Sequence, residues 1–322
     1  MKSEREDINM SKKILLNGVD GNFGGVAAKV LLEKWPHEDL IFCAPTAAGL
    51  KPYEGVVETR VADLNKPEEL VKAYSGADTM ILISMPFIGE KRRKAHKAAI
   101  DAAVEAKVDR IVYTSIVGAG HPEINAYEVN DHIYTEKLLR EADIHYVIMR
   151  NSQYAEAMVS IFLDSYENGG AIVNNMGEGK MAHISRKDCA LAASCAAMSD
   201  HSDVVLEVNG KELRTITEFC EVGSKVTGKK VVYQYVNDED QFKFFDSIGV
   251  PRTTEGEWAE SAKNFPYCSE GMVTFGRAIR LNQMNTFTNT FKELTGQDPI
   301  SLEEMFANPD EFLVGARTST EE

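Results

Sequence analysis

A strand, a glycine turn and a helix start follow one another between residues 13 and 25, and this segment constrains the fold most. The run Ile-Leu-Leu at residues 14–16 is typical of a buried strand in a parallel sheet. Gly18, Gly21 and Gly24 then give the spacing G-x-x-G-x-x-G, and a helical pattern begins at once. A lone glycine pattern has low specificity, but its place between a strand and a helix raises that specificity.

Each glycine has its own physical role in such a turn. Gly18 permits the tight turn, Gly21 lets the backbone approach a pyrophosphate, and Gly24 lets the helix pack closely on the strand. The helix start at Asn22 and Phe23 offers backbone N–H groups and the positive end of the helix dipole to a phosphate. The segment therefore predicts a dinucleotide-binding turn, and an ordinary glycine-rich turn is the alternative.

Composition narrows the function classes. The 322 residues are 43% apolar and 26% charged, which suits a globular core in one large or two modest domains. The formal net charge of −15 argues against nucleic-acid binding, which needs a basic face. No apolar run has the length of a membrane span and no signal peptide is evident, so we expect no membrane partner. Five scattered cysteines without C-x-x-C spacing favour a cytoplasmic location with reduced thiols, and no metal site is expected.

Strands and helices alternate through the first half of the chain. Further strands are predicted at residues 40–44, 56–62, 79–84, 110–115 and 146–149, and helices at residues 67–74 and 91–106. This alternation implies right-handed βαβ units and an α/β fold with a doubly wound parallel sheet of Rossmann type. Ligands of such sheets bind beyond the carboxyl ends of the strands. The charged run at residues 90–94 is expected to be a solvated helix start.

The second half of the chain has shorter strands and more helical periodicity. Strands are predicted at residues 171–174, 204–208 and 231–236, and a helix of small residues at 189–198. We predict three parts, which are a flexible N-terminal extension, a dinucleotide-binding Rossmann domain and a smaller, mostly helical substrate-binding part with strands that return to the sheet. Their expected bounds are residues 1–12, 13–165 and 166–322, with Met10 as an alternative start.

Several short motifs carry a resemblance to a known family, and their order and spacing make it specific. They lie at residues 18–24, 63–64, 113–115, 132–137, 149–151, 154, 169–173 and 294–302. With these motifs the chain resembles the NmrA-like atypical short-chain dehydrogenases/reductases over residues 13–306. It is most similar to the branch of bacterial NAD(P)H:quinone reductases and triphenylmethane dye reductases. The resemblance implies a nicotinamide cofactor and an aromatic or quinonoid hydride acceptor.

The cofactor is expected to be NADH, with NADPH less favoured. Family members that use NADPH often carry an arginine after the second strand, where it contacts the 2′-phosphate. Residues 43–46 (Cys-Ala-Pro-Thr) contain neither an arginine nor an acid, and Lys51 is the nearest cation. The turn and the resemblance together assign the following residues to cofactor binding: Gly18, Gly21, Asn22, Phe23, Gly24, Asp63, Leu64, Ser84, Met85, Thr114 and Asn151.

A second departure from the family concerns proton transfer. Against the Tyr-x-x-x-Lys pair of ordinary short-chain reductases, Glu128 takes the tyrosine position and His132 the lysine position. An isolated ketone is then hard to reduce, because a developing alkoxide needs a strong acid partner. A quinone spreads its charge over a ring and yields a phenolate, whose pKa of about 10 is judged from tyrosine. We predict that His132 donates a proton, assisted by Tyr154, and that His132→Ala lowers turnover with little loss of stability. The alternative is a surface histidine paired with Glu136.

Four residues are predicted to contact the substrate. Phe87 follows the fourth strand, Ser115 ends the fifth, Tyr154 follows the sixth, and His183 lies in a later loop. Each has a structural alternative, namely core packing, strand-end capping, a packed loop tyrosine and a structural loop histidine.

These expectations together describe an NAD(P)H-dependent oxidoreductase that transfers hydride to a planar conjugated aromatic or phenolic substrate. The resemblance makes reductive C-ring cleavage of flavanones and flavanonols to dihydrochalcones a specific candidate. Two alternatives stay open, which are an NAD(P)H:quinone or dye reductase and an NmrA-like redox-sensing regulator without turnover. A small aromatic molecule is the expected partner, and the chain is a monomer or a homo-oligomer.

Overall fold

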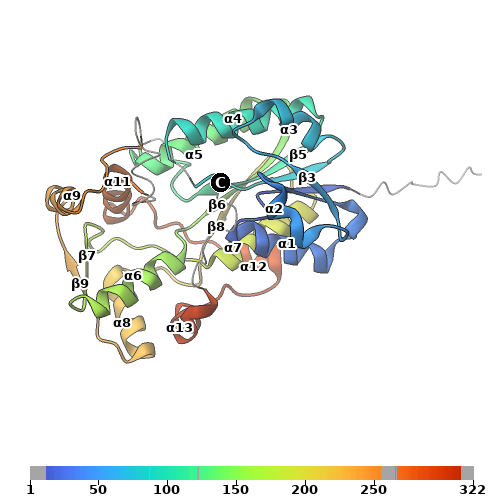
Figure 1. Cartoon of the computed structure of the whole chain (residues 1–322). Coiled ribbons are helices and arrows are strands. Elements are labelled where there is room, and N and C mark those ends of the chain that lie inside the picture. The colour runs from blue at the N-terminus through green and yellow to red at the C-terminus, as the bar shows by residue number, and fades with distance from the viewer. Residues whose placement is uncertain (1–11, 87, 122, 255–264, 266, 313–322) are drawn as a thin grey trace, which may run out of the picture.

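Parallel strands form the central sheet on which the rest of the chain is arranged (Figure 1). The computed structural model describes residues 12–86, 88–121, 123–254, 265 and 267–312. Within these residues the sheet has seven strands in the order β3-β2-β1-β4-β5-β6-β8, and all its pairings are parallel. The strands are β1 (Ile14–Asn17), β2 (Leu40–Ala44), β3 (Glu58–Val61), β4 (Thr79–Leu82), β5 (Arg110–Ile116), β6 (His145–Asn151) and β8 (Val204–Val208).

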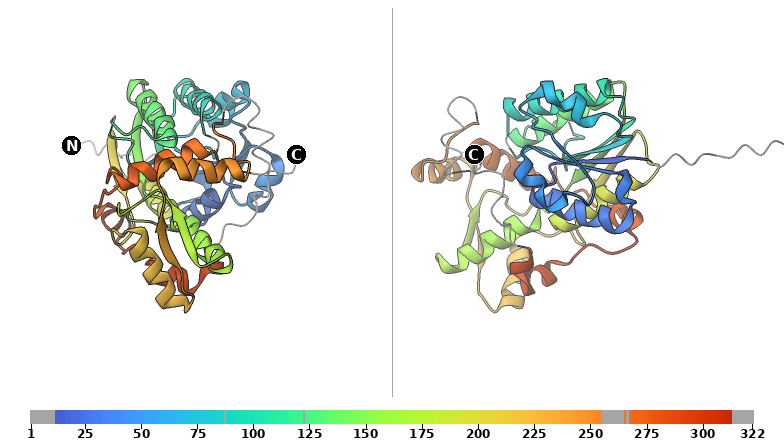
Figure 2. Two further views of the ribbon diagram at one scale, coloured as in Figure 1. Left: turned by 90° about the vertical axis from the view of Figure 1, so that its left-hand side faces the viewer. Right: turned by 45° about the vertical axis from the view of Figure 1, so that its right-hand side comes forward.

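Helices cover both faces of this sheet, as the right-hand view of Figure 2 shows. The alternation of side chains along β1 explains why: Leu15 packs into one core, while Ile14 and Leu16 pack into the other. One face is covered by α3 (Pro67–Tyr74), α4 (Glu90–Glu105) and α5 (Tyr127–Glu141), and the other by α1 (Asn22–Lys34), α7 (Arg186–Met198) and α12 (Thr290–Thr295). The predicted doubly wound α/β class is confirmed.

The order of the strands reverses between β1 and β4. From β1 the chain moves outward to β2 and β3, and it then returns to β4 and continues in the opposite direction to β8. The loops after β1 and β4 therefore diverge to opposite faces of the sheet. Parallel sheets of this type bind their ligands in the crevice that this reversal opens.

The remaining elements lie mainly beyond the carboxyl ends of the strands (Figure 1). Two strands pair there in a separate parallel sheet, β7 (Ala171–Asn174) with β9 (Val232–Tyr235). The helices of this part are α6 (Ala155–Glu167), α8 (Ile216–Thr227), α9 (Asp238–Ser247), α11 (Ser269–Arg280) and α13 (Leu302–Ala307). Since α7, β8 and α12 belong to the layers of the main sheet, the chain after residue 165 contributes to both parts. The division at residue 165 stays a prediction.

Short helical turns complete the described chain. They are α2 (Ala47–Leu50), η1 (His37–Asp39), η2 (Lys51–Tyr53) and η3 (Pro309–Glu311). The strand predicted at residues 56–62 begins later, at Glu58, because the backbone N–H of Val56 turns back to the carbonyl oxygen of Tyr53. None of the helices in the described part of the chain is long and apolar enough to cross a membrane. Met10 and the rest of the first eleven residues lie outside the described residues.

Candidate cofactor and substrate site

The glycine turn after β1 has the backbone that its sequence predicts. Gly18 has a φ of 80°, in the region that favours glycine, and its N–H donates to the carbonyl oxygen of Cys43 at 2.9 Å. A Cβ on Gly24 would lie 2.0 Å from the carbonyl oxygen of Gly18, so the first turn of α1 can approach the loop only with glycine here. A Cβ on Gly21 would meet nothing closer than the Gly18 carbonyl oxygen, at 3.5 Å, which is an ordinary van der Waals contact.

The N-terminus of α1 suits a phosphate group. Gly21 is its N-cap residue, no side chain caps the helix, and no acidic residue lies in its first turn. Phe23 is buried in the core on the α1–α7 face and can offer only its backbone, whereas Asn22 is exposed. The uncapped N–H groups, the dipole and the cleared approach at Gly21 fit a dinucleotide pyrophosphate.

Several buried polar side-chain atoms that lack a hydrogen bond of ordinary geometry lie at the carboxyl ends of β4 and β6. The buried Ser84 Oγ makes no hydrogen bond of ordinary geometry among the described residues and has only a weak interaction with the Tyr113 hydroxyl, although the Ser84 N–H donates to Thr114 Oγ1 at 2.8 Å. Both polar atoms of the Asn151 amide are likewise buried and make no hydrogen bond of ordinary geometry. Two further atoms just after β6, Ser152 Oγ and Gln153 Oε1, are also buried without a hydrogen bond of ordinary geometry. Since buried polar groups in native proteins are almost always paired, this cluster indicates the site of a polar ligand.

A buried histidine fixes the loop that follows β4. The His96 Nε2 atom accepts a hydrogen bond from the Met85 N–H at 3.0 Å, so its Nδ1 carries the proton and donates to Thr135 Oγ1 at 3.0 Å. Burial, with the nearby Arg92 charge, lowers the pKa of His96 to about 3, so the ring is neutral. The loop with Ser84 and Met85 is therefore held at the reversal point of the sheet. Phe87, in the same loop, lies outside the described residues.

The pair predicted to hold the adenine end of the cofactor follows β3. Asp63 Oδ1 accepts hydrogen bonds from the Asn65 backbone N–H and side-chain amide, both at 2.9 Å, which fixes the turn. Leu64 is buried in the core under α3 and α4. Asp63 is half-buried at the same carboxyl edge as the glycine turn.

His132 lies in a buried polar network between β5, α4 and α5. Its Nδ1 is 2.8 Å from the Tyr113 hydroxyl, and its Nε2 is 3.3 Å from an Arg92 nitrogen. Burial, aided by the neighbouring Arg92 and His96, lowers the pKa of His132 well below its usual value. The alternative of a surface pair with Glu136 is wrong, because both side chains are buried and Glu136 has other partners.

Glu136 forms a second buried network, and it includes Ser115. The Ser115 hydroxyl donates to Glu136 at 2.7 Å, and the Arg150 and Arg140 guanidiniums donate to the same carboxylate. These hydrogen bonds hold the pKa of Glu136 below its usual value even though burial alone would raise it. The Ser115 side chain thus points to the α5 face, whereas that of its neighbour Thr114 contacts the loop after β4.

The structure does not bring His132 and Tyr154 together. Tyr154 is the N-cap residue of α6, packs against the core of the α1–α7 face, and lies under the Arg186 guanidinium at 4.7 Å. His132 contacts Tyr113, whose ring belongs to the core of the opposite face. Burial also raises the pKa of the Tyr154 hydroxyl. Their catalytic roles stay predictions.

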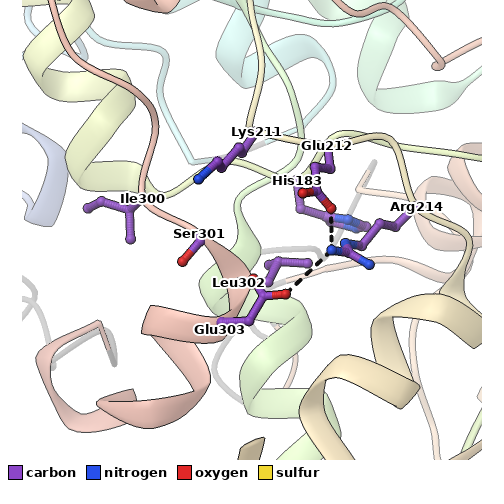
Figure 3. A pocket seen from close by; sticks show the side chains of 8 residues that line it. All are labelled: His183, Lys211, Glu212, Arg214, Ile300, Ser301, Leu302 and Glu303. Atoms are coloured by element: carbon purple, nitrogen blue, oxygen red, sulfur yellow. Dashed lines mark hydrogen bonds and ion pairs between the residues drawn. The ribbon is translucent and has the colours of Figure 1, made fainter. Parts of the chain in front are cut away.

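His183 lines a small pocket away from the glycine turn (Figure 3). It is buried against Phe219, with ring centroids 5.4 Å apart, and neither of its ring nitrogens has a partner among the described residues. Arg214 in this pocket pairs with Glu212 and Glu303. The free space of about 10 Å³ holds one water molecule at most, so it cannot take a planar aromatic substrate.

The sequence prediction missed the residues that surround His132. Arg92 belongs to the run expected to be solvated, yet it is buried, and Arg93 pairs with the buried Asp131 at 2.8 Å. The expected solvated helix start is confirmed for Glu90, Lys91 and Lys94, which are exposed, and is wrong for Arg92, because α4 packs against α5 along that face. One sequence signal could have indicated this burial. The alanines of the helix at residues 91–106 are spaced for close packing against a neighbouring element.

A doubly wound sheet with an uncapped helix start behind a glycine turn defines a dinucleotide-binding protein of the Rossmann type. The chain belongs to the NAD(P)H-binding family, whose model matches residues 18–200. An NmrA-like family domain-containing oxidoreductase of Aspergillus flavus is 24% identical over 294 residues, which are 89% of this chain and 92% of the relative, in line with the expected resemblance.

Relatives of known structure share nearly the whole fold. Quinone oxidoreductase 2 of Escherichia coli K12 is 29% identical over 241 residues, which are 74% of this chain and 82% of the relative. The structure of the NADPH-dependent quinone oxidoreductase of E. coli with NADPH gives a TM-score of 0.80 at 24% identity, and covers 92% of this chain and 99% of its own. The Citrobacter sp. triphenylmethane reductase with NADP(H) gives a TM-score of 0.79 at 27% identity, with the same coverage.

Proposed function

We propose that this protein is an NADH-dependent reductase of quinones and similar conjugated aromatic acceptors. One observation carries the choice of acceptor. His132, which the sequence predicts at the lysine position of the Tyr-x-x-x-Lys pair, is buried, neutral and bound to Tyr113 and Arg92. A carbonyl whose reduction needs a lysine-activated tyrosine is therefore a poor substrate.

The negative charge that develops on the hydride acceptor decides which molecules remain candidate substrates. When bound, the nicotinamide supplies a hydride. A quinone or a cationic dye takes up this negative charge without a strong acid, because the charge spreads over a ring or cancels a positive charge. Quinone and dye reduction are also the activities in the names of the E. coli and Citrobacter relatives.

The chain's own residues have binding and orienting roles in this proposal. The uncapped start of α1 holds the pyrophosphate, and the open approach at Gly21 admits it. Ser84 and Asn151 have buried polar atoms without a hydrogen bond of ordinary geometry, and these atoms are suited to hydrogen bonds with the cofactor. His96 keeps the loop after β4 in place, which excludes alternative positions of Ser84 and Met85.

NADH is the proposed cofactor, although both relatives of known structure hold NADPH or NADP(H). The segment after β2 has no cation next to Ala44. Arg60 on β3 is bound to Glu58 and to the carbonyl oxygens of Ala73 and Ser75. Lys51 is exposed on η2 and would have to fold back to reach a 2′-phosphate.

The test is an anaerobic assay of NADH oxidation with menadione, a triphenylmethane dye and the flavanone naringenin. We expect turnover with menadione or the dye, and a higher kcat/KM with NADH than with NADPH. Gly21→Val is the matched control, since it should fold but not bind the cofactor. Turnover with naringenin alone would replace the proposal with flavanone cleavage. NADH binding without turnover of any acceptor would point to a redox-sensing regulator.

A further inference from the structure

Asp20, inside the glycine turn, projects toward the end of β2. A Cβ on Gly49 would lie 2.8 Å from the Asp20 Cβ, 3.3 Å from the Asp20 Cγ and 3.1 Å from the Ala44 Cβ. The Asp20 side chain, the last residue of β2 and the first turn of α2 therefore form one packed group. Gly49 must be a glycine here because Asp20 occupies the space of its side chain.

The carboxylate of Asp20 faces the segment after β2 and does not cap α1. No side chain caps the N-terminus of α1. Asp20 lies near enough to Tyr53 on η2 that its charge adds to burial in raising the pKa of that hydroxyl. The Thr46 hydroxyl accepts a hydrogen bond from the Gly49 N–H and caps the N-terminus of α2. The carboxylate is half-buried beside the turn that receives the pyrophosphate.

This is the place where a dinucleotide-binding fold distinguishes its two cofactors. In such folds an acid at the end of the second strand accepts a hydrogen bond from the ribose 2′-hydroxyl of NADH, and an arginine there accommodates a 2′-phosphate. The end of β2 has neither residue, but Asp20 brings a carboxylate to Ala44 from the neighbouring turn.

We propose that Asp20 selects NADH by accepting a hydrogen bond from the adenosine ribose and by repelling the 2′-phosphate of NADPH. The inference rests on the proposed function, and it adds the residue that sets the cofactor. Two like charges in a half-buried place repel strongly, because solvent screens them less than at the surface. Since Arg60 is already bound to Glu58, it does not neutralise this carboxylate.

The test measures binding and needs no acceptor. Dissociation constants for NADH, NADPH, AMP and adenosine 2′,5′-bisphosphate are measured by calorimetry for the wild type, Asp20→Asn and Asp20→Thr. We expect the wild type to bind NADH at least tenfold more tightly than NADPH. Both variants should reduce this ratio at least tenfold, mainly through tighter binding of NADPH and of the bisphosphate.

The control is Glu54→Gln, which removes an exposed negative charge at the end of η2 and should leave the ratio unchanged. A ratio unchanged in both Asp20 variants overturns the inference. So does an equal change in Glu54→Gln, because the effect would then come from net charge. A wild type that binds neither NADH nor AMP contradicts the proposed function itself, so the two failures are distinguishable.

Discussion

The Nδ1 atom of His132 lies 2.8 Å from the Tyr113 hydroxyl in the buried space between α5 and β5. On the other side of the ring, Nε2 faces an Arg92 nitrogen at 3.3 Å. An arginine can only donate, so Nε2 accepts and Nδ1 carries the proton that it donates to Tyr113. Both nitrogens are engaged, and because the Arg92 guanidinium stays protonated, any part of His132 in proton transfer must pass through Tyr113.

His132→Ala should lower stability clearly, contrary to the expectation for a helix-surface residue. The substitution leaves the buried Arg92 guanidinium and Tyr113 hydroxyl without this partner, at a cost of about 1–3 kcal/mol for each buried polar group. The check is the melting temperature against His121→Ala, which removes an exposed histidine.

Turnover of the same His132→Ala variant, measured well below its melting temperature, tests the predicted proton donor. A loss of roughly 10²-fold or more at full cofactor saturation would support a part for His132 in the chemical step, exerted through Tyr113. Turnover within a few-fold of wild type, together with a lower melting temperature, would leave His132 a structural role only.

Three glycines at the start of α1 should respond differently to a side chain. Gly24→Ala places a Cβ 2.0 Å from the Gly18 carbonyl oxygen, so we expect a lower melting temperature and loss of NADH binding. Gly21→Val should keep its stability and lose NADH affinity, because the side chain enters the pyrophosphate approach.

Gly25→Ala is the control in this series. Its Cβ would meet nothing nearer than 3.9 Å, and alanine favours a helix over glycine by about 0.5–1 kcal/mol. Stability and NADH affinity should both be retained. Equal NADH affinity in Gly21→Val and wild type would remove the assigned cofactor site.

Ser115→Ala and Asn151→Leu should separate structural from binding contributions at adjacent strand ends. Ser115 donates to Glu136 within a buried network, so its loss should cost about 0.5–1.5 kcal/mol of stability without changing NADH affinity. Asn151→Leu removes an amide that makes no hydrogen bond of ordinary geometry and interacts only weakly with the Tyr154 hydroxyl, so stability should hold while NADH affinity falls. Calorimetry measures the NADH affinity and thermal melts measure the stability. If Ser115→Ala lowered NADH affinity and Asn151→Leu lowered only stability, Ser115 would be the ligand-binding residue.

Asp188 should make stability depend on pH. Its carboxyl accepts a hydrogen bond from the Ile300 N–H at 2.9 Å, and burial raises its pKa to about 6 from an ordinary 3.8. The folded protein thus binds this proton more tightly than the unfolded chain. The resulting stability is present below pH 4 and is lost as the pH rises from about 4 to 6, by on the order of 2–3 kcal/mol.

Asp188→Asn keeps the acceptor oxygen for Ile300 and removes the titration. Its melting temperature relative to wild type should therefore rise by a few degrees between pH 4 and pH 7. Asp164→Asn, at an exposed position, should show no such trend. A difference between Asp188→Asn and wild type that is the same at both pH values would contradict the assignment.

The local features of this protein followed from the sequence alone. The apolar run of β1 and the spacing of Gly18, Gly21 and Gly24 predict a buried strand, a tight turn and a close helix, and the structure has all three. Each depends on backbone preferences and contacts within a few residues, so neighbouring letters suffice to determine it. The alternation of strands and helices likewise predicts the doubly wound sheet.

Tertiary structure alone decided which polar side chains are buried and what they contact. Arg92 and His132 are forty residues apart, and the packing of α4 on α5 brings them together in one buried network. Asp20 meets Gly49 only because β1 and β2 are neighbours in the sheet. The burial of a polar side chain and its hydrogen-bond partners depend on residues distant in sequence. The periodicity of apolar residues in the sequence reports only which residues share one face of a helix or strand.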